Sequence, residues 1–141
     1  MKKLFPRQTI IRTKYFDVHQ DWEVPIPGFF IIASVRSVKS ISEFNQEEIK
    51  EFARLLFKMR QGMKKTLNVN KVYLFQDESS SHNFHLWILP IYSWMNEFGL
   101  KIESIRPIIN YSKSKMKTKE VFEKVKQSVK KMKKYMLKSK L

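Results

Sequence analysis

The segment 76–90 holds the residues best suited to chemistry, because two histidines follow a run of serines there. Downstream of the serines, polar or aromatic residues alternate with apolar ones, so a strand would place Asn83, His85 and Trp87 on one face. A neutral imidazole attacks phosphorus without a metal, and serine hydroxyl and backbone N–H groups donate to phosphate oxygens. The pattern therefore indicates phosphoryl chemistry centred on His85, or a structural histidine beside a serine-rich turn (Ser79, Ser80 and Ser81).

Residues 83–90, Asn-Phe-His-Leu-Trp-Ile-Leu-Pro, resemble the signature of the histidine triad (HIT) family, in which three histidines alternate with apolar residues. His85 falls at the middle position, and the resemblance implies that it is the nucleophile that forms a nucleotidyl-histidine intermediate. Asn83 and Trp87 stand at the first and third positions, so two of the three histidines are replaced.

Upstream segments resemble the diadenosine tetraphosphate hydrolase-like branch of that family, in the stretches His-Gln-Asp at 19–21 and Glu-Val-Pro-Ile-Pro-Gly-Phe at 23–29. The resemblance covers residues 15–92. It implies that Asp21 accepts hydrogen bonds from the ribose, and that Gln76 and Ser80 belong to the phosphate-binding loop. Phe29 and Ser37 replace histidines that are usual in the family.

Most of the remaining candidate site residues have two possible roles. His82 protonates the leaving group or lies in solvent, and Asn83 orients His85 or binds phosphate. Ser79 would donate to phosphate together with Ser80. Arg36 contacts phosphate or is a surface arginine, and Trp87 lines the pocket or packs. We expect no cofactor and no metal site, because the chain has no cysteine and its three histidines lack acidic partners at ligand spacing.

The sequence pattern predicts an α+β fold, with an antiparallel sheet, a long helix after the second main strand and a C-terminal helix, as in HIT proteins. Strands are expected within 9–18 and at 29–35, 72–75 and 84–91. The long helix at 45–67 has a capping box formed by Asn45 and Glu48. A second helix is expected from about Lys117.

Charge separates the chain into a HIT-like domain at 1–111 and a basic helical extension at 112–141. The extension holds twelve lysines and two glutamates of a chain whose formal charge is +15. We expect it to pack on the domain or on a dimer partner, and to contact polyanions or simply to be solvated. The homodimer itself is implied by the family resemblance alone.

These observations favour a cytoplasmic location. No leader is recognisable before Pro6 and Arg7, and the longest apolar stretch, 24–35, is too short to cross a membrane. The leading hypothesis is an enzyme, a HIT-type hydrolase or nucleotidyl transferase that cleaves a nucleotide phosphoanhydride such as a diadenosine polyphosphate. The alternative is a non-catalytic module that binds nucleotides or other polyanions.

Overall fold

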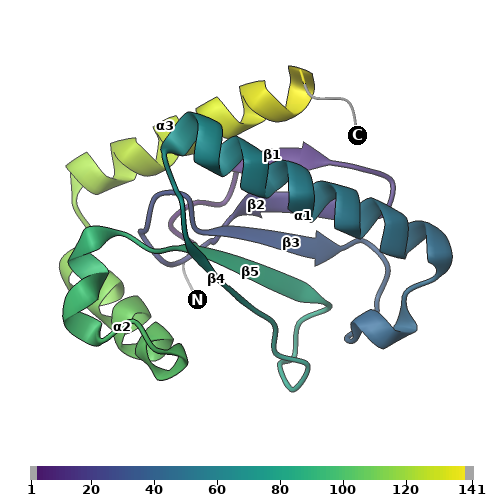
Figure 1. Ribbon diagram of the computed structural model, residues 1–141, viewed down its shortest axis with the longest axis horizontal. Helices are drawn as coiled ribbons and strands as arrows, with labels where there is room; N and C mark the ends of the chain where they lie inside the picture. The colour runs from purple at the N-terminus through teal and green to yellow at the C-terminus, as the bar shows by residue number, and fades with distance from the viewer. Residues whose placement is uncertain (1–2, 139–141) are drawn as a thin grey trace.

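The computed structural model describes residues 3–138 and is built around one antiparallel sheet (Figure 1). The strands lie in the order β1-β2-β3-β5-β4, and all neighbours are antiparallel. Their bounds are Thr9–Arg12 for β1, Phe16–Gln20 for β2, Phe30–Ser34 for β3, Val72–Phe75 for β4 and His85–Pro90 for β5. Every residue of β3 is buried, which agrees with the continuous apolar run in the sequence.

Helix α1 (Gln46–Leu67) follows β3 through a short 3₁₀ helix, η1 (Ile41–Glu43). Asn45 caps it by accepting a hydrogen bond from the backbone N–H of Glu48, and the Glu48 side chain accepts from the N–H of Asn45. The predicted capping box is thereby confirmed. At the other end Asn68 adopts the left-handed conformation, with φ of 57°, and ends the helix.

Helix α3 (Lys119–Lys138) lies beside α1 over one face of the sheet (Figure 1). Its buried side chains repeat at helical spacing and join the core beneath both helices, while its lysines face outward. The main core includes Phe16, Ile32, Leu55, Ile88 and Met132.

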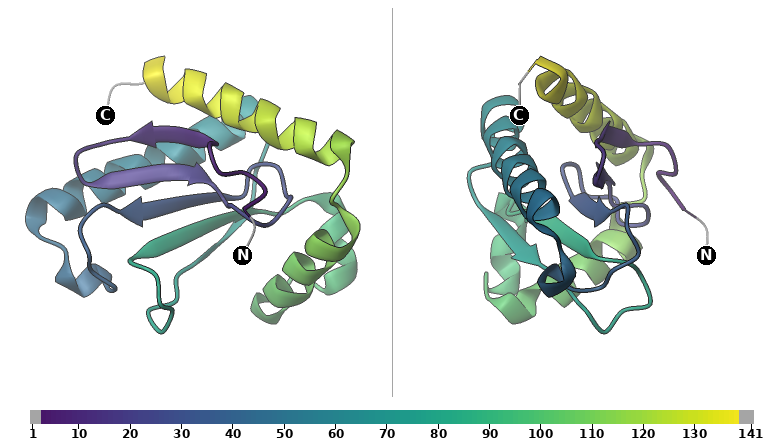
Figure 2. Two further views of the ribbon diagram at one scale, coloured as in Figure 1. Left: turned by 180° about the vertical axis from the view of Figure 1, so that it is seen from behind. Right: turned by 90° about the vertical axis from the view of Figure 1, so that its right-hand side faces the viewer.

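A second apolar cluster lies on the opposite face of the sheet. There α2 (Ile105–Lys115), with the 3₁₀ helices η2 (Ser93–Phe98) and η3 (Ile102–Ser104), packs away from α1 and α3 (Figure 2). Ile108 of α2 contacts a cluster that includes Phe29 and Leu89. Because α2 covers only part of this face, the rest of the face is left open as a cavity wall.

The α+β class and the antiparallel sheet with its two long helices confirm the predicted fold class. The helical segment 93–115 was not predicted. The expected domain boundary at 111/112 falls inside α2, and α3 packs on the chain's own β1 and α1. Residues 139–141 of the predicted extension lie outside the described residues.

Within residues 3–138, no helix combines the length and apolar character needed to cross a membrane. The cytoplasmic location and the homodimer stay predictions.

Candidate active site

His85 reaches the open face of the sheet because its neighbour Phe84 is anchored on the other face. The Phe84 ring packs edge-on against Phe44 and Phe52 of the main core, with centroid distances of 4.9 and 5.4 Å. The strand alternation then turns His85 toward the opposite side. Trp87 lies on the same side as His85, which confirms that part of the predicted pattern.

Two rows of paired residues cross this open face. In one row Arg12 pairs with Asp17, Asp17 with Ala33, and Ala33 with His85. The neighbouring row is largely aromatic, and consists of His19, Ile31, Trp87 and Phe75. Strand pairing alone therefore brings residues from five separate strands to one surface.

The His85 ring is half-buried and stacks on His82, with ring centroids 5.1 Å apart and planes within 13°. Trp87 meets the same ring edge-on at 5.5 Å. Burial, together with the nearby His82 and His19, lowers the pKa of His85 to about 4. The imidazole is therefore neutral near pH 7.

The two ring nitrogens of His85 have different surroundings. Nδ1 is buried and has no hydrogen-bond partner among the described residues. This leaves Nε2 as the nitrogen through which His85 can reach a ligand. A neutral imidazole with one accessible nitrogen is a competent nucleophile.

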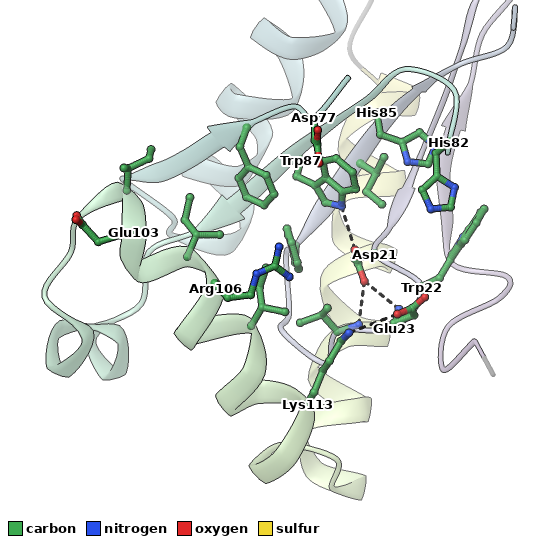
Figure 3. Close-up of a pocket in the computed structure, with 17 residues that line it drawn as sticks. Asp21, Trp22, Glu23, Asp77, His82, His85, Trp87, Glu103, Arg106 and Lys113 are labelled. Atoms are coloured by element: carbon green, nitrogen blue, oxygen red, sulfur yellow. Dashed lines mark hydrogen bonds and ion pairs between the residues drawn. The ribbon is translucent and has the colours of Figure 1, made fainter. Parts of the chain in front are cut away.

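A cavity of about 500 Å³ extends from the histidine pair to α2 (Figure 3). Its floor is the apolar side of β3, β4 and β5, and its far wall is α2. The apolar lining residues include Phe29, Ile31, Phe75, Trp87, Ile105 and Ile109. The polar or charged lining residues include Asp21, Glu23, Asp77, Arg106 and Lys113. A cavity of this size that combines an apolar floor with polar groups is typical of sites for small organic ligands.

Asp21 is the central polar group of this cavity. Its Oδ1 accepts hydrogen bonds from the backbone N–H groups of Glu23 and Val24, both at 2.9 Å, and its Oδ2 accepts from Nε1 of Trp87 at 3.1 Å. Burial raises the pKa of Asp21, and the three hydrogen bonds oppose that shift. The carboxylate is thereby fixed in direction, and Oδ2 retains acceptor capacity toward the cavity.

A second cavity of about 320 Å³ lies on the other side of the histidine pair. Both cavities are lined by Trp22, His82 and His85, so the two imidazoles stand at their junction. The remaining polar lining residues of the second cavity include Arg12, Asp17, His19 and Asn83. His19 stacks on Trp22 at 4.7 Å, and its Nδ1 lies 2.8 Å from the Gln20 carbonyl oxygen.

Asn83 lies next to the histidine pair but before β5 begins. Its Oδ1 accepts a hydrogen bond from the Ser37 hydroxyl at 3.1 Å, which leaves its amide N–H groups as donors.

The serine turn is placed differently from the prediction. Ser79 donates its N–H and its hydroxyl to Asp77, at 2.9 and 2.6 Å, and the Ser80 carbonyl accepts from Lys39 at 2.8 Å. Gln76 donates to the Lys39 carbonyl. These contacts hold the loop toward the segment after β3, and none of Gln76, Ser79 and Ser80 lines either cavity. The predicted serine cradle for phosphate is therefore not supported by the geometry.

Arg36 is likewise directed elsewhere. Its guanidinium donates to both carboxylate oxygens of Glu48, at 3.1 and 2.9 Å, and to the Glu43 carbonyl. The ion pair between Arg36 and Glu48 lowers the pKa of Glu48 and stabilises the start of α1. Arg36 lines neither cavity, so its predicted contact with phosphate is not supported.

Sequence reasoning missed the residues that α2 contributes. Arg106 and Lys113 point from α2 toward the cavity (Figure 3). Lys113 pairs with Glu23 at 3.5 Å. The hydrogen bonds from Ser79 lower the pKa of Asp77, and the charge of Arg106 also lowers it. Arg12 and Asp17 were also missed, because only the pairing of β1 with β2 and β3 brings them near His85.

No group of three or more histidine, aspartate or glutamate side chains within residues 3–138 has a geometry that would hold a metal ion. The chemistry that this arrangement offers on its own is nucleophilic attack by His85 on an electrophile held between two cavities. The apolar cavity suits a flat organic group, and the polar cavity suits a charged or hydroxylated one.

No family model matches the chain, and no curated protein sequence matches it. Solved structures do match. A diadenosine triphosphate hydrolase from Plasmodium falciparum, in complex with cyclomarin A, has a TM-score of 0.63 at 16% identity, over 99% of this chain and 84% of that one. A hypothetical histidine triad nucleotide-binding protein from Sulfolobus tokodaii has a TM-score of 0.62 at 14% identity, over 92% and 85%.

A third match is a HIT-like protein from Bartonella henselae, described as involved in cell-cycle regulation. Its TM-score is 0.60 at 11% identity, over 90% of this chain and 84% of that one. Identities this low leave only the fold in common, and each match covers nearly all of this chain. The five-stranded sheet and its helices thus have the fold of the histidine triad proteins, as the resemblance of residues 83–90 implied.

Proposed function

We propose that this chain is a nucleotide phosphohydrolase of the HIT type, which cleaves a phosphoanhydride such as a diadenosine polyphosphate through a covalent His85–nucleotide intermediate. The observation that carries the proposal is a neutral His85 that stands at the junction of an apolar and a polar cavity. The structural similarity to a diadenosine triphosphate hydrolase supports the same substrate class.

In this proposal the apolar cavity binds one nucleoside of the substrate. Trp87 and Phe75, stacked within 9° of parallel at 5.5 Å, provide a flat aromatic floor for a base. Asp21 lies beside this floor and can accept a ribose hydroxyl at Oδ2. The nucleoside phosphate then extends toward His85 at the cavity's end.

The first chemical step is an exchange of bonds at phosphorus. Nε2 of His85 forms a bond to the α-phosphorus while the bridging P–O bond breaks, and the leaving group departs as a phosphate oxyanion. The proton on Nδ1 stays on the ring. Water then attacks the same phosphorus and releases His85, and His82, which stacks on His85, takes the proton from that water. The amide of Asn83 donates to a phosphate oxygen.

The replaced triad positions favour an anhydride over a phosphoramidate. A phosphate leaves an anhydride as a stable anion and needs no proton, whereas an amine leaving group must be protonated by a general acid. Asn83 and Trp87 cannot act as such acids, which among the described residues beside His85 leaves His82 for that role. We therefore expect the ratio of kcat/KM values, anhydride over phosphoramidate, to exceed one at pH 7.

The deciding experiment incubates the protein with diadenosine tetraphosphate and measures products by chromatography and the intact mass after an acid-free quench. We expect AMP-sized mass addition on His85 and release of AMP. His85→Ala should abolish both, and Arg54→Ala, at an exposed position on α1 that lines neither cavity, serves as the comparison.

If His85→Ala turned over diadenosine tetraphosphate as fast as the wild type, His85 would not be the nucleophile. Nucleotide binding without product over hours would instead establish the alternative, a non-catalytic nucleotide-binding module.

A further inference from the structure

The second cavity contains polar residues that the proposed first step does not use. We propose that it is a subsite for the leaving half of the substrate, in which Arg12 and Asp17 recognise a nucleoside phosphate. This inference rests on the proposed function and adds to it the residues that would select the leaving group.

The row of paired residues sets the distance between His85 and these side chains. Adjacent strands are spaced by about 4.8 Å, so two strand spacings place Asp17 about 10 Å from His85 along the row. Arg12 lies one strand further. Such a span fits the three phosphates that separate the attacked phosphorus of diadenosine tetraphosphate from the second ribose, and exceeds what an inorganic phosphate alone would bridge.

Ala33 creates the space along that row. It is the smallest residue of the row and stands between Asp17 and His85, and it contributes to the wall of the second cavity. A larger side chain at this position would project into the path between the nucleophile and Asp17. The cavity volume of about 320 Å³ is smaller than that of the nucleoside cavity, which is consistent with a partly enclosed leaving half.

The charged groups of Arg12 and Asp17, at the end of the row furthest from His85, indicate which ligand the second cavity would bind. The Asp17 side chain lines the second cavity and is 31% exposed, and its Oδ1 has no hydrogen-bond partner among the described residues, so the carboxylate can accept from a ligand. Oδ2 lies 3.5 Å from Nη1 of Arg12, whose side chain is 63% exposed and keeps most of its N–H groups available. An acceptor beside a cation matches a ligand with hydroxyl donors and a phosphate.

A nucleoside phosphate has both groups, because its ribose carries hydroxyl donors and its phosphate carries the negative charge. Pyrophosphate lacks the donor that Asp17 requires and would be repelled by the carboxylate. A simple amine lacks the anion that Arg12 would bind. The subsite therefore favours a dinucleoside polyphosphate over a nucleotide with a small leaving group.

The test compares two substrates that share the first half and differ in the leaving group. One is diadenosine tetraphosphate, and the other is the p-nitrophenyl ester of AMP, whose phenolate has neither phosphate nor ribose. The variants are Arg12→Ala, Asp17→Ala and Ala33→Val. Loss of a hydrogen bond to a charged group corresponds to about tenfold or more in kcat/KM.

We expect Arg12→Ala and Asp17→Ala to lower the ratio of kcat/KM values, tetraphosphate over nitrophenyl ester, by about tenfold. Ala33→Val should lower the same ratio by narrowing the path between His85 and Asp17. Arg54→Ala and Ala53→Val, at exposed positions on α1, are the matched controls and should leave the ratio unchanged. An equal loss on both substrates, or no loss on either, would overturn the subsite.

A binding measurement separates this inference from the proposed function. Titration calorimetry with AMP and with diadenosine tetraphosphate, carried out in the His85→Ala background, requires no turnover. The subsite predicts that Arg12→Ala and Asp17→Ala weaken tetraphosphate binding by about tenfold more than AMP binding. If the wild type binds but never forms the His85 adduct, the proposed function fails while this comparison still decides the subsite. Equal effects on both ligands would count against it.

Discussion

The protonation of His85 offers a direct test of the site. Burial, with the neighbouring His82 and His19, lowers the pKa of His85 from 6.5 to about 4. At pH 5 a group with pKa 4 is about nine-tenths neutral, whereas a histidine with the ordinary pKa is about 3% neutral. The rate of His85 adduct formation at pH 5 should therefore stay at about nine-tenths of its value at pH 7.5, whereas a histidine with the ordinary pKa would retain about 3% of it.

The assay is a titration of the three histidine rings by NMR, together with the rate of adduct formation from pH 7.5 to 4. The His85 resonance can be assigned with the variants His19→Asn and His82→Asn. We expect His82→Asn to raise the pKa of His85, because it removes one of the groups that lower it. A His85 midpoint near 6.5 in the folded protein would refute the reasoning.

The same shift has a consequence for stability. The folded chain binds the His85 proton less readily than the unfolded chain, in which the pKa is near 6.5. The stability that neutral His85 contributes is fully present above pH 6.5 and is lost as the pH falls through about 4. Replacing His85 with Asn should therefore flatten the fall in Tm over this range.

Three further predictions concern other parts of the fold. Trp87→Phe removes the hydrogen bond to Asp21 and should lower the free energy of unfolding by about 1.5–3 kcal/mol, measured by urea denaturation. Gly62→Ala should lower it by about 1–3 kcal/mol, because a Cβ there would lie 2.7 Å from the Tyr135 ring and force α1 from α3; an unchanged midpoint would contradict this packing. Binding of single-stranded DNA through the outward face of α3 should weaken steeply with salt, and should be lost when three lysines are replaced with glutamine (Lys126, Lys130 and Lys133).

Local patterns were enough to predict much of this molecule. The Asn45–Glu48 capping box and the apolar spacing behind it define α1, because both act within a few residues of the chain. The alternation around His85 predicts which side chains share its face, since the strand pleat requires it. Both features depend on interactions close in sequence.

Features that depend on distant contacts were not predictable in this way. The direction of the serine turn is set by Asp77 within the loop and by Lys39 from another segment. Helix α2 has a short apolar repeat and contains Pro107 in its first turn, where proline is tolerated but weakens the helical pattern. Its packing on Phe29 and Leu89 stabilises it, and that contact is long-range.

The replacement of two triad histidines changes how reactive a substrate must be for this site to cleave it. A histidine nucleophile whose Nδ1 has an acceptor gains stabilisation as the ring becomes positive, and Nδ1 of His85 has no such acceptor among the described residues. The site therefore gives less help to the formation of the covalent bond. It also lacks a histidine at position 87, where an indole instead holds Asp21. Catalysis must then rely on an electrophile that is already reactive and on precise placement between the two cavities. A phosphoanhydride with a nucleoside at each end meets both conditions. Its leaving phosphate departs as a stable anion, and each of its two nucleosides can bind in one of the cavities.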